Sequence, residues 1–202
     1  MKKMLVRAAI FAILTTGVGI ASAGNAMACD GSARSDEFAS GLPQVHYGQH
    51  GQHVLALQLA LRHTGYTSLQ GTGNYATNTL KAVRDFQRKH GIKDSGIVGS
   101  KTWHALVGAM PEYQTFGGQA PKYSITPGER NRDKVDTLGL IIQRIHPYSA
   151  RTLPDGDVYG PTLQKMVKDF QRRAGIKASG IVGQKTWAAM MEAASASGGW
   201  GC

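Results

Sequence analysis

The sequence DFQRKHGIKDSGIVGSKTW occupies Asp85 to Trp103, and DFQRRAGIKASGIVGQKTW occupies Asp169 to Trp187. The two stretches lie 84 residues apart and are identical at 15 of 19 positions. A repeat of this length and identity indicates an internal duplication, so one copy with its flanking residues should form one structural unit. We therefore predict that the chain builds the same small module twice.

The residues on either side of the first copy predict three helices. Apolar residues recur at helical spacing over about 52–63, so the first helix should bury one face. A second helix is predicted over 76–90, and a short third helix after the loop at 96–99, with Ser100 as its N-cap. The apolar stripe of the first helix consists of Val54, Leu57 and Leu61, widened by Leu55 and Leu59. The inward side chains of the other two are Leu80, Val83, Phe86, Trp103, Leu106 and Val107.

The second copy predicts the same three helices. Pro161 suits the first position of the middle helix, because the missing N–H has no partner there in any case. The first helix is less regular than its counterpart, since Gly139 interrupts it and a His-Pro pair follows it. The predicted core residues of this copy are Val135, Leu138, Ile142, Met166, Val167, Phe170 and Trp187.

The first 28 residues have the layout of a secretory signal peptide. Three basic residues precede an apolar run and a segment of small residues, and cleavage is expected after Ala28 or Ala23. A retained membrane anchor is the alternative, but the run is shorter than the roughly 20 apolar residues of a membrane span. We expect export and, after cleavage, no contact with the membrane.

The mature chain should be basic. Removing three leader charges from the formal net charge of +10 leaves +7. Such a charge favours encounters with anionic surfaces such as cell walls, although solubility alone would also explain it. Export, and the lack of a phosphate loop or zinc-finger spacing, argue against nucleic acid as a partner.

Two cysteines, Cys29 and Cys202, lie near the two ends of the mature chain. In an oxidising compartment they could pair and tie the termini together. Alternatively, Cys29 is a lipidated first residue, because it directly follows Ala28. The two interpretations stay open on the sequence alone.

The repeated pattern resembles the peptidoglycan-binding module of bacterial wall hydrolases and spore-cortex enzymes. The residues that carry the resemblance in the first copy are Gly51 to Gln58, Gly65-Tyr66, Ala82-Val83, Phe86-Gln87 and Gly96 to Trp103; those in the second are Asp155-Gly156, Tyr159-Gly160-Pro161, Val167, Phe170-Gln171 and Gly180 to Trp187. The first loop departs from the family, which more often has an acidic residue, glycine and Phe-Gly at 73–76. The second copy also lacks the Leu-Gln pair of the first helix.

The resemblance implies an all-α fold of two tandem three-helix modules joined by a Gly/Pro-rich linker. We place the signal peptide at 1–28, the modules at 43–110 and 124–194, and the linker at 111–123. It also implies non-covalent attachment to peptidoglycan, which the family usually provides beside a separate catalytic domain. No stretch outside the copies approaches the roughly 100 residues of such a domain.

Recognition of peptidoglycan requires amides for its acetamido and peptide groups, cations for its carboxylates, and rings that can lie on its sugars. Each candidate also has a structural alternative, either closing a loop or lying on a solvated helix face. The shared Phe and Trp residues are expected in the core. The candidate ligand contacts are Gln58, Gln87 and Gln171 among the amides, Tyr66, Tyr75 and Tyr159 among the rings, and Arg84 and Lys168 among the cations.

No cofactor, metal site or catalytic centre is predicted. Four histidines suggest zinc, but no acid or cysteine lies in that stretch to complete a ligand set. Asp85 and Asp169 should pair with neighbouring Arg or Lys, and a single carboxylate per module does not make a glycosidase. The histidines are His46, His50, His53 and His63.

We therefore expect a secreted, non-catalytic cell-wall protein that binds peptidoglycan through two modules, whose two weak sites on one chain would raise retention. The alternatives are a small peptidoglycan hydrolase and an accessory protein that targets a secreted hydrolase to the wall.

Overall fold

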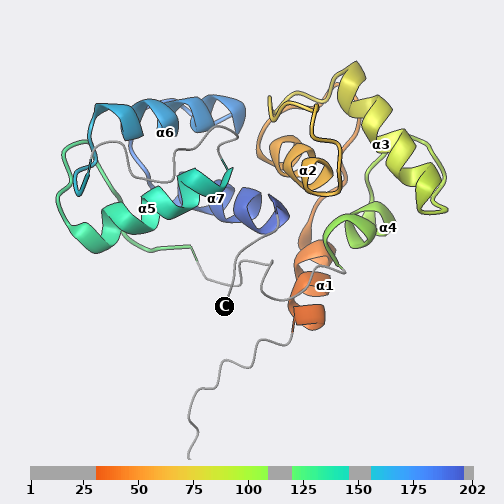
Figure 1. The fold of residues 1–202 in the computed structure, drawn as a ribbon, viewed down its shortest axis with the longest axis horizontal. Helices are drawn as coiled ribbons and strands as arrows, with labels where there is room; N and C mark the ends of the chain where they lie inside the picture. Colours follow the sequence, from red (N-terminus) through yellow and green to blue (C-terminus); the bar gives the residue numbers. More distant parts are fainter. Residues whose placement is uncertain (1–30, 109–119, 146–155, 198–202) are drawn as a thin grey trace, which may run out of the picture.

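The structure is a computed structural model that describes residues 31–108, 120–145 and 156–197 (Figure 1). Within these ranges the regular elements are helices, and strand-like pairing is limited to isolated bridges. None of the described helices is long and apolar enough to cross a bilayer. The predicted signal peptide, Cys29, Cys202 and residues 109–119 lie outside the described residues. The elements are α1 Gly31–Gly41, α2 Gln52–His63, α3 Thr77–Lys89, α4 Ser100–Trp103, the π-helical turn η1 His104–Gly108, α5 Arg132–Ile145, α6 Pro161–Arg173 and α7 Gln184–Ser197.

The first module packs α2, α3 and the α4–η1 segment around one core. Phe86 and Trp103 are buried in it, and the Trp103 indole N–H donates to the carbonyl oxygen of Pro43 at 2.8 Å. The prediction that Ser100 caps the third helix is wrong, because Gly99 is the N-cap and Ser100 is the first helical residue. The Ser100 hydroxyl instead lies 3.3 Å from Nδ1 of His104.

Helix α1, which the sequence did not predict, packs against η1. Its sequence has few apolar residues at helical spacing, so periodicity alone gives little signal. Ala39 is buried in the first core, and the Ser35 hydroxyl donates to the carbonyl oxygen of Gly108 at 2.8 Å. Helix α1 and its contact with η1 thus lie N-terminal to residue 43, where the first module is predicted to begin.

The second module repeats this arrangement with α5, α6 and α7. The Trp187 indole N–H donates to Tyr123 O at 2.8 Å, as Trp103 does to Pro43. Helix α6 starts at Pro161, as predicted, and α5 runs through Gly139 without interruption. Gln184 Nε2 also donates to Pro121 O at 2.8 Å, so the last residues of the predicted linker contact the second module.

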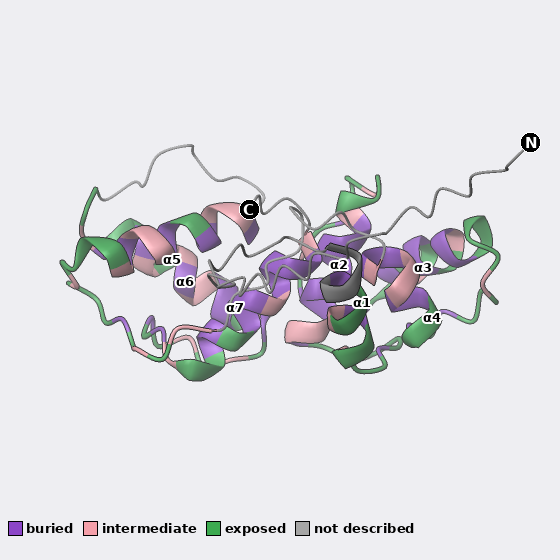
Figure 2. Cartoon of the chain, turned by 90° about the horizontal axis from the view of Figure 1, so that it is seen from below, coloured by how far each residue is buried: buried purple, intermediate pink, exposed green. Residues whose placement is uncertain are grey.

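The two modules share a packed interface formed mainly by α2 and α7 (Figure 1). The prediction that α2 buries a single face is wrong, because all eight residues from 54 to 61 are buried. Leu57 and Leu61 lie in the core of the first module, whereas Leu55 and Leu59 lie in the core of the second. Figure 2 shows this continuity as buried residues running through both helices. The sequence showed that these leucines are apolar but not that α7 covers them.

Polar contacts surround this apolar interface. Glu192 of α7 accepts hydrogen bonds from Gln52 Nε2 at 3.0 Å and contacts Nδ1 of His53 at 2.7 Å. Gly73 approaches α6 so closely that a Cβ atom built on it would lie 1.9 Å from the carbonyl oxygen of Arg173. Gly73 also has a φ of +74°, a conformation that favours glycine. The lack of a side chain at Gly73 therefore allows the loop to pack directly against α6 of the other module.

Candidate functional site

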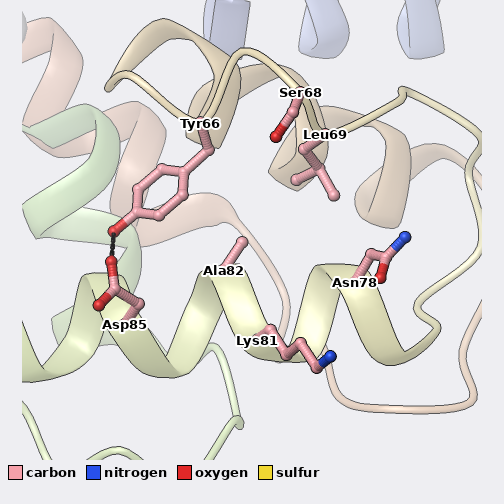
Figure 3. A pocket seen from close by; sticks show the side chains of 7 residues that line it. All are labelled: Tyr66, Ser68, Leu69, Asn78, Lys81, Ala82 and Asp85. Atoms are coloured by element: carbon pink, nitrogen blue, oxygen red, sulfur yellow. Dashed lines mark hydrogen bonds between the residues drawn. The ribbon is translucent and has the colours of Figure 1, made fainter.

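An open groove of about 450 Å³ lies on the first module, between the turn that follows α2 and the outer face of α3 (Figure 3). Its walls combine hydroxyl, amide and charged groups with a small apolar floor from Leu69 and Ala82. The lining residues are Tyr66, Ser68, Leu69, Asn78, Lys81, Ala82 and Asp85.

Helical periodicity places one wall of the groove. Asn78, Lys81, Ala82 and Asp85 follow one another at intervals of three, one and three residues, so they share one face of α3. The opposite wall is a turn that the Arg62 guanidinium holds through Nη1, which donates to Leu69 O at 2.6 Å. Asn78 and Lys81 are not among the ligand contacts predicted from the sequence, although their spacing from Asp85 places them on the same helix face.

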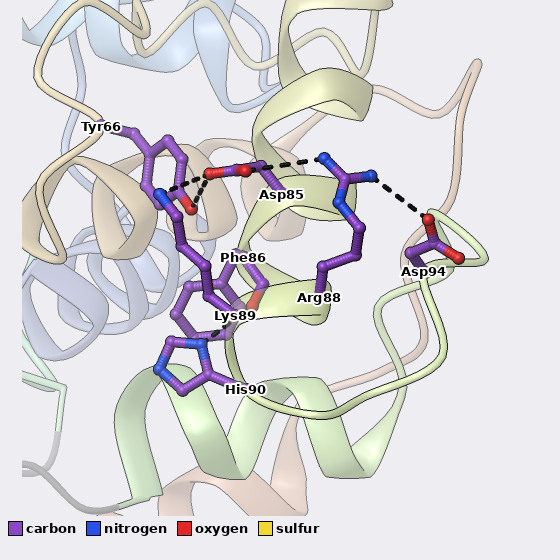
Figure 4. Close-up of polar contacts among 7 residues, drawn as sticks. All are labelled: Tyr66, Asp85, Phe86, Arg88, Lys89, His90 and Asp94. Atoms are coloured by element: carbon purple, nitrogen blue, oxygen red, sulfur yellow. Dashed lines mark hydrogen bonds and ion pairs between the residues drawn. The ribbon is translucent and has the colours of Figure 1, made fainter.

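The carboxylate of Asp85 is held by groups around it (Figure 4). It accepts a hydrogen bond from the Tyr66 hydroxyl at 2.8 Å and forms ion pairs with Lys89 at 2.7 Å and Arg88 at 3.5 Å. The hydrogen bond from Lys89, followed by that from Tyr66, lowers the pKa of Asp85. Asp85 therefore stays ionised and positions the Tyr66 ring, and its pairing with cations at helical spacing is as expected.

Lys81 is the cation of the groove that remains available to a ligand. Its side chain is exposed and forms no ion pair with any other described residue. The Asn78 amide and the Ser68 hydroxyl add donors and acceptors beside it. The groove can therefore accept a flexible polar chain that carries amide groups and a carboxylate.

The structure places five of the eight predicted ligand contacts inside the modules. The Gln58 amide donates to Asn74 O and Thr79 Oγ1, both at 2.9 Å, and accepts from Gly73 N at 2.8 Å. Buried polar groups in folded proteins are normally hydrogen-bonded in this way. The predicted contacts that are buried are Gln58, Tyr75, Gln87, Tyr159 and Gln171.

Gln87 and Gln171 have the same partners in the two modules. Gln171 donates to Ile181 O at 2.8 Å and to Thr186 Oγ1 at 3.1 Å, and accepts from Gly180 N at 2.9 Å. Gln87 contacts the equivalent three groups at 2.8, 3.1 and 3.0 Å. Both amides hold a loop to a helix, which explains why the duplication retains them.

The two loop tyrosines are buried rather than presented at a loop edge. The Tyr75 hydroxyl donates to Gly96 O at 2.6 Å, and the Tyr159 hydroxyl donates to Gly180 O. Burial raises the pKa of both phenols far above its usual value. Their placement gives no support to the prediction that they contact ligand, since the ring and hydroxyl are already used inside the module.

Three predicted contacts remain at the surface. Tyr66 lines the groove, and its ring also lies beneath Lys89, whose ammonium is 5.4 Å from the ring centroid. Arg84 is exposed on α3 outside the groove, and Lys168 is partly exposed on α6. Of the predicted ligand contacts, Tyr66 is therefore the one that lines the groove together with Asn78 and Lys81.

The histidines do not form a metal centre in the part of the chain that the structure describes, where no group of three His, Cys, Asp or Glu residues could hold an ion. His53 instead contacts Glu192 across the interface. This acid is not apparent from the sequence around His53, because Glu192 lies 139 residues away.

Polar and charged residues recur on α6 at the positions that line the groove on α3. Thr162, Lys165 and Asp169 stand 84 residues after Asn78, Lys81 and Asp85. Asp169 is again paired at helical spacing, with Arg173 Nε at 2.9 Å and Arg172 Nη2 at 3.3 Å.

Comparisons with known proteins identify the module. The family model named "Putative peptidoglycan binding domain" matches residues 50–106 and 142–190. The first match begins next to α2, whereas the second begins only near the end of α5. The two matched segments therefore carry the duplication seen in the sequence and in the fold.

Several relatives are cell-wall enzymes. The chain is 30% identical over 153 residues to the N-acetylmuramoyl-L-alanine amidase CwlL of Bacillus licheniformis, covering 69% of this chain and 42% of the amidase. It is 34% identical over 73 residues to the spore cortex-lytic enzyme of Bacillus subtilis, covering 36% of this chain and 24% of that enzyme. The chain thus spans less than half the length of these enzymes.

Another relative has a length similar to the matched region. The uncharacterized protein in the bpoA1 3'region of Kitasatospora aureofaciens is 31% identical over 119 residues, covering 58% of this chain and 97% of that protein. Together with the two family matches and the repeated three-helix architecture, this places the chain in the peptidoglycan-binding domain family.

Proposed function

We propose that this chain is a secreted, non-catalytic protein that attaches to the bacterial cell wall by binding peptidoglycan through its two modules. Membership of the peptidoglycan-binding domain family and similarity to wall amidases support the polymer as the ligand. The signal-like leader at 1–28 supports export. The modules predicted at 43–110 and 124–194 would then present their surfaces as one packed body.

The groove of the first module is the proposed contact with the polymer. The single observation that carries this assignment is Lys81, an exposed ammonium without a carboxylate partner among the described residues, beside the Asn78 amide in an open groove. A carboxylate or lactyl-peptide segment of peptidoglycan could pair with Lys81 while its amides bond to Asn78 and Ser68. Arg84 and Lys168 would contribute cationic charge outside the groove.

Co-sedimentation of the purified protein with insoluble peptidoglycan tests this proposal. The wild-type protein should pellet with the polymer, and Lys81→Ala should weaken the binding by about three- to fivefold, as expected for loss of one exposed charged hydrogen bond. Lys122→Ala is the matched control, because Lys122 is an exposed lysine outside the groove. No pelleting of the wild type would overturn the function, and equal weakening by both variants would overturn the groove assignment.

Catalysis is tested on the same material. The protein should leave the turbidity of a cell-wall suspension unchanged and release no muropeptides. Clearing of the suspension would instead favour the alternative of a small peptidoglycan hydrolase.

A further inference from the structure

Both modules present an isoleucine to solvent at the same point of the repeat. Ile97 exposes 44% of its surface and Ile181 exposes 46%. In the described ranges they are two of four large apolar residues with such exposure, the others being Tyr47 and Leu140. Each lies in an identical Ser-Gly-Ile-Val-Gly segment.

Hydrogen bonds fix the loop that carries each isoleucine. Ile97 O accepts from Gln87 Nε2 at 2.8 Å, and Ile97 N donates to Ser95 Oγ at 3.1 Å. Val98 pairs with Val45 through two backbone hydrogen bonds of 2.9 and 2.7 Å. The second module repeats these contacts with Gln171, Ser179, and Val182 paired with Ile125. These hydrogen bonds hold each loop in one conformation without a ligand, and such preorganisation lowers the entropic cost of binding.

Two lysines accompany each isoleucine. Lys93, Lys101 and Ile97 line the same open pocket of about 470 Å³. Their counterparts 84 residues later are Lys177 and Lys185, and all four lysines are exposed and form no ion pair within the described ranges. Lys185 is the second residue of α7, where a cation opposes the helix dipole. Its presence there is not explained by the stability of the helix.

Folding explains the other shared residues of these loops but not the isoleucines and lysines. The glutamines, the serines and the bridging valines have partners inside the module. An exposed side chain is free to differ between two copies without cost to the core, yet Ile97, Lys93 and Lys101 all recur. Their recurrence indicates a shared contact outside the module.

The chemistry of this surface fits a peptide better than a sugar. The aromatic side chains that the two copies share are at most 2% exposed, so none offers its face to a sugar ring. An exposed isoleucine that lines a pocket together with two lysines instead complements small aliphatic side chains next to free carboxylates. The shared aromatic residues are Tyr75 and Tyr159, Phe86 and Phe170, and Trp103 and Trp187.

We propose that the loops around Ile97 and Ile181 form a duplicated site for the anionic, alanine-bearing stem peptides of peptidoglycan. The proposal rests on the proposed function and specifies which part of the polymer is bound at these loops. Each isoleucine would pack against alanine methyl groups, while Lys101 or Lys185 pairs with a peptide carboxylate.

Two double variants of the full chain test the site in the sedimentation assay. Ile97→Ser with Ile181→Ser should raise the apparent Kd about tenfold, from lost apolar contact. Lys101→Gln with Lys185→Gln should raise it about five- to tenfold, and added salt should reduce the difference from wild type. Neither variant should lower the melting temperature, since all four side chains are exposed. Soluble stem peptides should displace the wild-type protein from the wall.

Controls match each change in chemistry. Leu140→Ser removes an exposed apolar residue of α5, and Lys122→Gln with Arg130→Gln removes two exposed positive charges that form no ion pair within the described ranges. Both should bind like wild type. If wild type pellets but the loop variants bind as tightly as their controls, the proposal is overturned and the proposed function stands. Displacement by peptide-free glycan strands but not by stem peptides overturns the ligand class, whereas a wild type that fails to pellet overturns the proposed function itself.

Discussion

Replacing Leu55 by alanine should destabilise both modules, because this residue of α2 is buried in the core of the other module. Leu55 is 1% exposed, and its Cδ1 lies against the loop at Gly71, 3.3 Å from the position of a built Cβ atom. Leu-to-Ala changes at such positions cost about 2–5 kcal/mol, the spread depending on how far the site collapses. We expect a loss of about 3 kcal/mol, which for a domain of this size lowers the melting temperature by roughly 6–12 °C.

Calorimetry combined with chemical denaturation measures this effect. Wild type should unfold in a single transition, since α2 contributes to both cores. Leu57→Ala, a change of equal size within the first core, should cost a similar amount. Leu140→Ala, at a residue that is 58% exposed on α5, should stay within about 0.5 kcal/mol of wild type. If Leu55→Ala unfolds like Leu140→Ala, the shared core does not exist.

Two further predictions concern buried and interfacial polar groups. Gln171→Leu should cost about 2–4 kcal/mol in denaturation experiments, because Gly180 N and Ile181 O lose their partner in the interior; no loss would mean that water replaces the amide. The hydrogen bond to Glu192 raises the pKa of His53. The stabilisation from the contact between His53 and Glu192 should therefore be fully present below about pH 6.5, the pKa of histidine in the unfolded chain. It should be lost as the pH rises through the pKa of His53 in the folded protein. The stability difference between wild type and Glu192→Gln, followed from pH 5 to 9, should shrink with rising pH, and a constant difference would contradict this coupling.

Helices were predicted best where a single segment contains both the apolar periodicity of the helix and the residues that begin or end it. Helix α2 begins and ends where its periodicity indicated, and α6 starts at Pro161, whose ring favours that position. Helix α1 was missed because its position depends on packing against η1 rather than on its own apolar pattern. The cap at Ser100 was misassigned because glycine and serine are adjacent there and both suit an N-cap.

The binding residues were harder to predict than the fold. Gln87 and Gln171 recur in the repeat because they secure a loop, and a repeated amide looks the same in sequence whether it faces a ligand or a backbone. Lys81 and Asn78 stand out only once the turn at 66–69 lies opposite them. The contact of Glu192 with His53 depends on the packing of distant helices, which periodicity within one segment does not contain.

Because α2 contributes to both cores, a fragment that contains only one module would expose apolar surface. A fragment that ends at residue 108 would leave Leu55 and Leu59 facing water on a helix with no cover, and such a bare apolar stripe promotes self-association. A single-module wall tag made from this chain would need polar residues at those two positions. The second half would in turn lose part of its core. We therefore expect that neither half folds stably on its own.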